Sequence, residues 1–425
     1  MDKDELIQIL MSEIERTTGC TDPVSISLAV SRATRELGRT PERVVVTVSP
    51  SLYKNAINVG IPGLDKRGLL WASALGAVID HSEAGLAILD YVDDEAIARA
   101  TRLLDQGRIE AGYADLPDVL YIRAQVFAGD DRAAAITQHD YSHIVEVSRN
   151  GVKTFVDDVV TGGAVKHAFA GYSIQELVEL IETIAADRLA FLIEAAEINK
   201  QAAMSGIENE AMQFGPALWR RSKDLPAPFA QAAKAQALTG AASEARMLGL
   251  VVPVIAVTGS GNQGITNFLG VLSVAEDLQV GRTRLAHALA ISSVITIYIK
   301  SLTERLTVFC GAAVAASTGV AAATTWLLGG DYVAMTHAMQ STLGTFAGVL
   351  CDGAKVSCAY KISTAISAAI QFAYLACDGV YVPEGDGIVA KTIEETFAYL
   401  GQLNRPGMTE TDAFMLETIQ KIQAS

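Results

Sequence analysis

The chain has 425 residues, of which 50% are hydrophobic and 19% are charged, and its formal net charge is -15. The length predicts two domains, since a single core seldom grows beyond about 250–300 residues. The acidic balance argues against nucleic acid and against an anionic membrane as partners. The N-terminal stretch "MDKDELIQIL" lacks the basic and apolar regions of a signal peptide, so we expect a cytoplasmic protein.

The first part of the chain alternates helical and strand patterns. Apolar residues at helical spacing predict a helix over residues 4–16, and Asp22 followed by Pro23 predicts the N-cap and first turn of a second helix. The β-branched run over residues 43–50 predicts a strand. Further helical patterns cover residues 68–79 and 93–105.

Short strand patterns then follow over residues 119–158, where the Asn150-Gly151 pair indicates a tight hairpin. Together with the strand at 43–50, they predict an antiparallel sheet with helices packed against it. We therefore expect residues 1–168 to form an α+β domain with a small antiparallel sheet, and the N-terminal helices of this domain to carry the "TGCTDP" motif.

The remainder of the chain is predicted to be a mostly α-helical domain, residues 169–425. A capping box at Ser173 and Glu176 opens it, and "LVVPVIAV" (250–257) is its one strand-like run. The uncharged run at 308–330 is rich in Ala, Gly, Ser and Thr, which insert poorly into membranes. We expect a buried helix there rather than a membrane span.

Cys20 lies in "TTGCTDP", directly before the predicted start of a helix. Unpaired backbone N–H groups and the positive end of the helix dipole favour a thiolate there, so the motif predicts a lowered thiol pKa. A small buried residue in a turn is the other interpretation.

"VTGSGNQGIT" (257–266) contains a G-x-G-x-x-G pattern between an apolar run and a helical pattern. This arrangement is typical of dinucleotide sites, but the acidic residue expected at the end of a second strand is absent. A glycine loop at a helix N-terminus also binds carboxylates, and Asn262 and Gln263 would add neutral hydrogen bonds.

Cys310, Cys351 and Cys358 allow four interpretations: core residues, a disulfide, a metal site or reactive thiols. A reducing cytoplasm and an odd total of five cysteines argue against a disulfide framework. If 351–358 were one helix, its two cysteines would lie about 10 Å apart, unless Gly353 interrupts it. The six histidines show no zinc-type spacing with these cysteines, whereas three thiolates without a fourth ligand suit an iron–sulfur cluster with one open iron. Cys377 lies in an apolar helical run and is expected in the core.

Lysines beside a glycine loop also occur in pyridoxal-phosphate enzymes, which makes Lys355 and Lys361 Schiff-base candidates. Those folds need an extended α/β sheet, which this part of the sequence does not predict.

At these motifs the chain resembles the L-cysteine desulfidase family, which is related to the α subunit of bacterial iron–sulfur L-serine dehydratase. The resemblance rests on "TTGCTDP", "YKNAINVGIPG", "GSGNQGIT", "CGAAVAASTG" and "GVLCDGAKVSCAYK", in the same order over residues 13 to 390. Many relatives have a second cysteine where this chain has Ala312.

The resemblance implies an α,β-elimination that converts L-cysteine and water to pyruvate, ammonia and hydrogen sulfide. It further implies that Cys310, Cys351 and Cys358 hold a [4Fe-4S] cluster and that Cys20 is the base that removes the α-proton. We take Lys54, Asn55, Asn262 and Gln263 as candidates for binding the amino-acid substrate.

Two alternatives remain: an L-serine dehydratase with the same machinery, and a non-catalytic amino-acid-binding relative. The expected partner is a small amino acid, without nucleic acid or membrane, and a homodimer is a candidate assembly.

Overall fold

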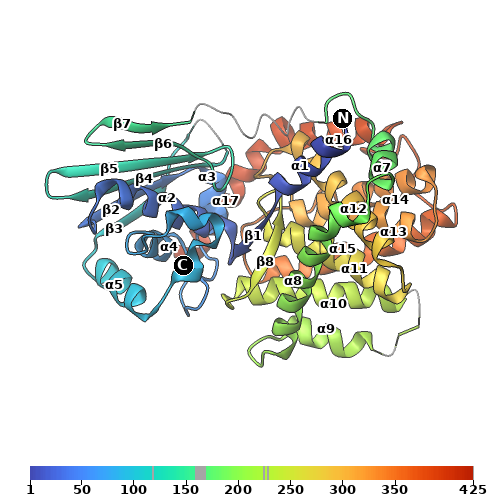
Figure 1. The fold of residues 1–425 in the computed structure, drawn as a ribbon, viewed down its shortest axis with the longest axis horizontal. Helices are drawn as coiled ribbons and strands as arrows, with labels where there is room; N and C mark the ends of the chain where they lie inside the picture. The colour runs from blue at the N-terminus through green and yellow to red at the C-terminus, as the bar shows by residue number, and fades with distance from the viewer. Residues whose placement is uncertain (117–118, 158–168, 224, 227–228, 425) are drawn as a thin grey trace.

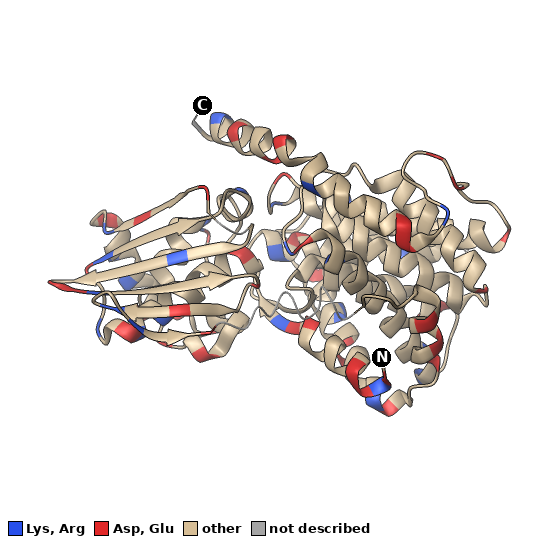
Figure 2. Ribbon diagram, turned by 90° about the horizontal axis from the view of Figure 1, so that it is seen from above, with Lys and Arg blue, Asp and Glu red and all other residues tan. Residues whose placement is uncertain are grey.

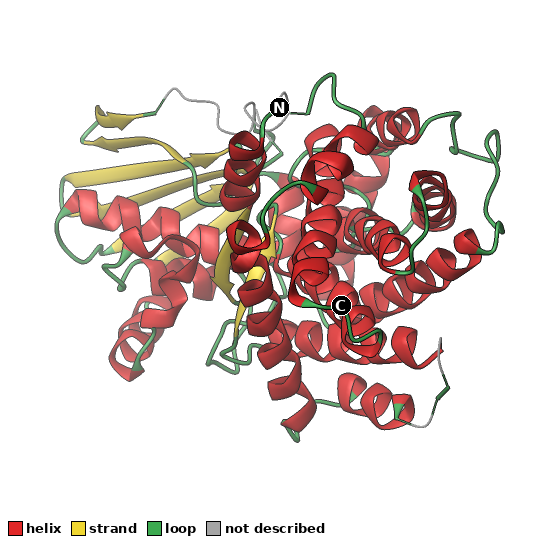
Figure 3. Cartoon of the chain, turned by 45° about the vertical axis from the view of Figure 1, so that its right-hand side comes forward, coloured by secondary structure: helices red, strands yellow, loops and turns green. Residues whose placement is uncertain are grey.

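The computed structural model has two lobes that lie side by side, one built on a β-sheet and the other almost entirely helical (Figure 1, Figure 3). The sheet lobe runs from Cys20 to Val156, and the helical lobe comprises the described residues before and after it. This arrangement confirms the predicted fold class, an α+β region followed by a mostly helical part. The structure describes residues 1–116, 119–157, 169–223, 225–226 and 229–424.

The main sheet has six strands in the order β3-β2-β4-β5-β6-β7. Neighbouring strands are antiparallel, as predicted, except that β2 and β3 are parallel. A parallel pair requires a long crossover, and the helices between β2 and β3 provide it. The strands are β2 (Arg43–Val48), β3 (Ile109–Tyr113), β4 (Tyr121–Ala128), β5 (Asp131–Gln138), β6 (Ile144–Arg149) and β7 (Val152–Val156).

The sequence pattern explains the β6–β7 turn of this sheet and the helix that packs against it. Asn150 and Gly151 both have positive φ, at 52° and 86°, and connect β6 to β7 as the predicted hairpin. Alternate residues of β2 are buried, and α2 packs across β4, β5 and β6. The predicted helices at 68–79 and 93–105 are present as α4 and α5. The helices of this lobe are α2 (Thr21–Leu37), α3 (Pro50–Ala56), α4 (Leu69–Gly76), η1 (Ser82–Tyr91) and α5 (Asp94–Asp105).

After the sheet lobe, the chain continues the helical lobe with α7, whose predicted capping box is formed by Ser173 and Glu176. Small residues let its helices approach closely: a Cβ placed on Gly319 would lie 2.3 Å from the carbonyl oxygen of Ser292. The helices are α7 (Ile174–Glu182), η2 (Ala186–Leu189), α8 (Ala190–Glu208), α9 (Phe214–Ser222), α10 (Phe229–Met247), α11 (Gly261–Asp277), α12 (Arg282–Thr303), η3 (Ala312–Ala316), α13 (Ser317–Leu327), α14 (Tyr332–Phe346), α15 (Ser357–Cys377), α16 (Ile393–Gln402), η4 (Leu403–Gly407) and α17 (Thr409–Ala424).

Within the described residues, one helix, α12, is long and apolar enough to cross a membrane by length and composition. Its apolar segment is 89% buried inside the fold, which is typical of a core helix. The uncharged run at 308–330 contains η3 and α13, and most of its residues are buried, as predicted.

The two lobes are joined through the ends of the chain. The predicted helix at 4–16 ends at Glu13 as α1 (Lys3–Glu13), and the next residues form β1 (Ile14–Thr18). β1 pairs antiparallel with β8 (Pro253–Val257), which lies inside the helical lobe. At the other end, α17 extends from the helical lobe toward the sheet lobe and contacts α3 (Figure 2). The predicted boundary at 168/169 adjoins residues 158–168, which lie outside the described residues.

Candidate functional site

A cavity of about 100 Å³ lies where the two lobes meet. Residues from both lobes line it, including four of the five cysteines. The structure therefore brings together most of the residues that the sequence singled out, although they span more than 300 positions. Those that line the cavity are Cys20, Asn55, Asn262, Gln263, Cys310, Cys351 and Cys358.

Two of the cysteines are placed by backbone pairing. The amide N–H of Cys310 donates to the carbonyl oxygen of Val349 at 2.7 Å, and that of Cys351 donates to Val308 at 2.7 Å. These bonds flank an antiparallel bridge between Phe309 and Leu350. Two segments 41 residues apart are thus fixed side by side, so that both thiols reach the same cavity.

Cys358 joins them because the chain is not one helix between 351 and 358. Gly353 has φ of 92°, and α15 begins only at Ser357. A Cβ on Gly353 would lie 2.5 Å from the carbonyl oxygen of Lys54, so a side chain would also clash with the sheet lobe. The turn at Gly353 removes the i, i+7 separation that a continuous helix would impose.

Helix N-termini converge on this cavity. Cys20 is itself the N-cap of α2, which begins at Thr21 rather than after Asp22 as predicted. Cys310 directly precedes the helical segment of η3 and α13, and Cys358 is the second residue of α15. α11 also begins here, with Ser260 as its N-cap. The unpaired N–H groups and positive dipole ends of these helices favour anions in the cavity.

The thiols themselves are not acidic in this setting. Burial raises the pKa of Cys310 to about 12 and that of Cys358 to about 11, and it raises the pKa of Cys20 well above its ordinary range. The neighbouring thiols and Asp22 add to the effect, since like charges disfavour ionisation. The lowered pKa predicted for Cys20 is therefore wrong, because burial outweighs the helix terminus.

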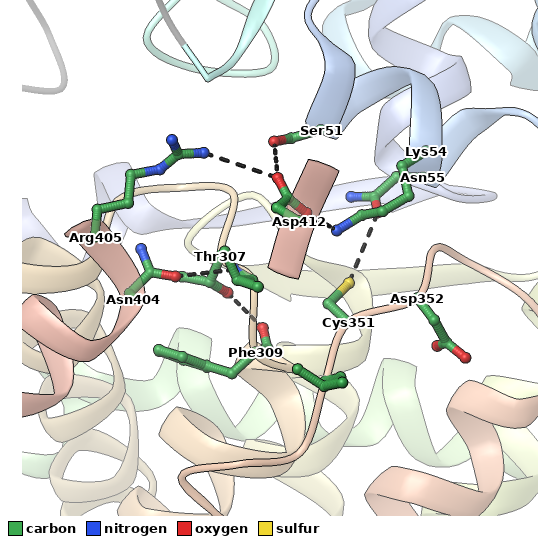
Figure 4. A network of polar contacts seen from close by, with 12 residues as sticks. Ser51, Lys54, Asn55, Thr307, Phe309, Cys351, Asp352, Asn404, Arg405 and Asp412 are labelled. Carbon is green, nitrogen blue, oxygen red and sulfur yellow. Dashed lines mark hydrogen bonds and ion pairs between the residues drawn. The ribbon is translucent and has the colours of Figure 1, made fainter. Parts of the chain in front are cut away.

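A hydrogen-bonded chain links the two walls of the cavity. The Cys20 thiol donates to Oδ2 of Asp22 at 3.4 Å, and Nδ2 of Asn55 donates to Oδ1 of Asp22 at 3.2 Å. On the opposite wall, the Cys351 thiol donates to Oδ1 of Asn55 at 3.7 Å (Figure 4). Burial raises the pKa of Asp22 to about 6. The sequence motif contained Asp22, but we interpreted it only as a helix cap.

Lys54 is the one predicted site residue that does not line the cavity. Its ammonium group is buried and pairs with Asp412 of α17, whose Oδ2 accepts a 2.6 Å hydrogen bond from Ser51 (Figure 4). Lys54 therefore ties the C-terminal helix to α3 in this structure.

The sequence analysis missed three cationic residues that line the cavity: Arg246, Lys300 and Arg305. Nη2 of Arg305 lies 2.7 Å from Glu13 and 2.5 Å from Asp140, which joins the two lobes through charge. Burial and the neighbouring Arg305 lower the pKa of Lys300 to about 7. Arg246 and Lys300 lie in the Ala-rich α10 and the apolar α12, where a buried charge is costly unless it has a partner or a function. Arg305 follows α12 outside any helix, and the sequence carried no such signal for it.

Cys310, Cys351 and Cys358 are the cavity residues that would hold a metal cluster. Among the described residues, no three His, Cys, Asp or Glu side chains are grouped to hold one metal ion. A [4Fe-4S] cluster distributes its cysteine ligands over different irons, so its ligands stand farther apart than those of one ion. Three free thiols around one cavity, facing helix N-termini, fit such a group.

Two other interpretations lose support. β8 and α11 do form a strand, glycine turn and helix, but β8 pairs only with β1 in a two-stranded antiparallel sheet, not in a parallel dinucleotide-binding sheet. Neither Lys355 nor Lys361 lines the cavity, and both pair with Asp352.

The fold and cavity together define a two-lobed protein with a cysteine-lined site between its lobes. The chain belongs to the serine dehydratase alpha chain family, whose model matches residues 83–417. That range contains Cys310, Cys351 and Cys358 and begins after Cys20.

Similar proteins cover nearly the whole chain. A UPF0597 protein of Methanocella arvoryzae is 50% identical over 419 residues, covering 99% of both chains. A UPF0597 protein of Photobacterium profundum is 34% identical over 415 residues, covering 97% of both. One from Caldanaerobacter subterraneus is 32% identical over 429 residues, covering 100% of both. The resemblance is thus confirmed for the serine dehydratase alpha chain family, and the desulfidase identity stays a prediction.

Proposed function

We propose that this protein is a lyase that catalyses α,β-elimination of a small β-substituted L-amino acid, with L-cysteine as the leading substrate. The observation that carries the proposal is the convergence of Cys20, Cys310, Cys351 and Cys358 on one cavity, although they lie up to 338 positions apart in the chain. Membership in the serine dehydratase alpha chain family supports the reaction class.

Cys310, Cys351 and Cys358 would hold a [4Fe-4S] cluster, which would supply an open iron as a Lewis acid for the leaving group. The helix N-termini around the cavity favour the negative charge of these thiolates. The backbone pairing of Cys310 with Val349 and of Cys351 with Val308 would keep two of the ligands fixed.

Cys20, on the opposite wall, is our candidate for the base. Its Sγ would take the α-proton, the Cα–H electrons would form the Cα=Cβ bond, and the sulfur at Cβ would leave as hydrosulfide. The resulting aminoacrylate hydrolyses to pyruvate and ammonia. To act as a base, Cys20 must first lose its own proton, and Oδ2 of Asp22 already accepts the hydrogen bond from that thiol.

Asn55 would set the orientation of this acid–base pair. Its amide donates to Asp22 and so would keep that carboxylate beside the Cys20 thiol. The hydrogen bond that Oδ1 of Asn55 accepts from the Cys351 thiol would be lost when Cys351 is deprotonated to bind iron, which would free this oxygen for the substrate. Asn262 and Gln263, at the start of α11, remain candidates for binding the substrate.

L-Serine is the second candidate substrate, favoured by membership in the serine dehydratase alpha chain family, and a non-catalytic amino-acid binder is the third candidate function. The test is to purify the protein without oxygen, reconstitute it, and measure iron, acid-labile sulfide and pyruvate release from L-cysteine and L-serine. We expect about four irons and four sulfides per chain and faster pyruvate release from L-cysteine. Faster release from L-serine would make it a serine dehydratase, whereas the absence of both iron and pyruvate would favour the binder.

A further inference from the structure

Arg246 is a charged residue that the proposed chemistry has not used. It lies in α10, is 2% exposed, and is the largest fully buried side chain among the described residues. Within the part of the chain that the structure describes, no Asp or Glu forms an ion pair with it. A buried, unpaired guanidinium is costly, so its presence at the cavity requires an anion or a function.

The contacts of Arg246 hold its guanidinium at the start of α11. Nη1 donates to Oδ1 of Asn262 at 2.8 Å, and Nη2 donates to the carbonyl oxygen of Gly19 at 2.5 Å. Gly261 lies directly against the group: a Cβ there would be 2.4 Å from Nη2. Nε is buried and has no partner among the described residues. The fork is therefore fixed in place while part of its donor capacity stays free.

We infer that Arg246 binds the α-carboxylate of the amino-acid substrate, with Asn262 and Gly261 holding the guanidinium at the N-terminus of α11. This inference rests on the proposed function and names the group that positions its substrate. Guanidinium matches carboxylate geometry with two parallel hydrogen bonds, and the first N–H groups of α11 have no intrahelical partner. The carboxylate would thus lie on the helical lobe, adjacent to Cys20, whose preceding residue Gly19 also contacts Arg246.

The main alternative is that Arg246 only offsets the charge of neighbouring groups. Cys20, Cys358 and Asp22 all interact electrostatically with it. A countercharge acts through its charge alone, so a lysine at position 246 would preserve its effect, whereas a bidentate carboxylate contact needs the guanidinium fork and would be lost with lysine. This difference defines the test.

Two unreactive thiols provide matched probes. 3-Mercaptopropionate has a thiol and a carboxylate but no amine, and cysteamine has a thiol and an amine but no carboxylate. We would measure their dissociation constants by calorimetry on the anaerobically reconstituted full-length protein, wild type, Arg246→Gln and the charge-retaining Arg246→Lys. We expect 3-mercaptopropionate to bind about 100-fold more weakly to Arg246→Gln, and Arg246→Lys to recover no more than about threefold of this loss because it lacks the guanidinium fork. Cysteamine should not bind more weakly to either variant. Full recovery of 3-mercaptopropionate binding in Arg246→Lys, equal weakening of both probes, or no change in either would overturn the inference.

A further variant covers the case in which Arg246→Gln does not fold. Gly261→Ala keeps the arginine but places a methyl group where the guanidinium lies, and it should weaken 3-mercaptopropionate selectively by about 10-fold. Gly281→Ala is the matched control, since nothing lies within 4 Å of a Cβ there.

Arg284→Gln is the control for the overall loss of one positive charge in Arg246→Gln, because Arg284 lies outside the cavity, over Trp326. Equal binding of both probes to Gly261→Ala and Gly281→Ala would contradict the inference.

The design separates this inference from the proposed function. Selective loss of 3-mercaptopropionate binding without pyruvate release from any amino acid would leave the carboxylate site standing and reject the lyase. Pyruvate release from L-cysteine, with unchanged probe selectivity in Arg246→Gln, would support the lyase and reject the role of Arg246.

Discussion

The two walls of the cavity carry the same type of side chain in different chemical settings. The helical lobe presents Cys310, Cys351 and Cys358 as a set of three thiols around one space. The sheet lobe presents a single thiol, Cys20, which donates a hydrogen bond to the buried carboxylate of Asp22. Three clustered soft donors suit a metal cluster, whereas a thiol beside a carboxylate suits proton transfer. The surroundings of each cysteine, rather than its identity, therefore support the proposed division into ligands and base.

Replacement of the single thiol gives the largest expected effect. In Cys20→Ser, pyruvate release from L-cysteine should fall by about 10²–10⁴-fold, the usual contribution of a general base, because a hydroxyl is a much weaker proton acceptor than a thiolate. Steady-state rates under anaerobic conditions measure this. Cys377→Ser is the matched control and should retain the wild-type rate, because Cys377 lies outside the cavity. The structure has Cys377 exposed near the end of α15, so its predicted position in the core is wrong. Comparable rates of pyruvate release for Cys20→Ser and wild type would show that Cys20 is not the base.

Arg305 is expected to contribute most to the stability of the junction between the two lobes, where it pairs with Glu13 and Asp140. Arg305→Gln would leave Glu13 and Asp140 without their cation near the lobe junction, at a cost of about 3–5 kcal/mol in the free energy of unfolding. Urea unfolding measures it. Arg16→Gln is the control, because the exposed Arg16–Asp90 pair should contribute at most about 1 kcal/mol. Equal losses in the two variants would mean that the junction does not depend on Arg305.

The turn at Gly353 positions Cys351 and Cys358 against the sheet lobe. Gly353→Ala combines a positive φ of 92° with a Cβ only 2.5 Å from the carbonyl oxygen of Lys54. We expect a loss of about 2–4 kcal/mol in stability, together with a lower iron content. Gly38→Ala has a similar φ of 79° but no atom within 4 Å of the new Cβ, so it should lose only about 1 kcal/mol. If both variants lose the same amount, the close approach to Lys54 does not matter.

A smaller effect should appear in the pH dependence of stability. Burial, together with the nearby Asp140, raises the pKa of Glu15 from 4.5 to about 7. The folded protein therefore binds this proton more tightly than the unfolded chain, and the stabilisation is present below pH 4.5 and lost as the pH rises through about 7. Between about pH 5 and 8, wild type should lose about 1–2 kcal/mol more than Glu15→Gln in urea unfolding.

Glu110→Gln is the control for the Glu15 measurement. In wild type, the hydrogen bond from Arg43 lowers the pKa of Glu110 below its ordinary value of 4.5. The contribution of Glu110 to stability is therefore present above that pH and is lost only as the pH falls through the lowered pKa. The variant should therefore follow the wild-type pH dependence above pH 5. A Glu15→Gln curve that is parallel to wild type would show that Glu15 does not titrate in this window.

The sequence predicted what depends on local pattern. The strand at 43–50, the Asn150-Gly151 hairpin and the capping box at Ser173 follow from local periodicity and turn chemistry, and the structure has all three. The grouping of Asn262, Cys310 and the other motif residues came from family resemblance, because nothing local brings such distant segments together.

What the sequence did not predict depends on contacts between distant segments. The pairing of β1 with β8 and the parallel position of β3 are long-range choices without a local signal. The pKa of Cys20 is raised because the thiol is buried, and Lys54 is also buried. Which side chains become buried is decided only when the whole fold packs together. Arg246 became visible as a functional candidate only when its lack of a carboxylate partner was known.

The most direct test of the division between the walls is the iron content of two cysteine variants after identical anaerobic reconstitution. Cys20→Ser should keep about four irons and four labile sulfides per chain while losing pyruvate release. Cys351→Ser should lose most of its iron together with its activity. Loss of iron from Cys20→Ser, or a full complement of iron in Cys351→Ser, would contradict the assignment of ligands to the helical lobe and the base to the sheet lobe.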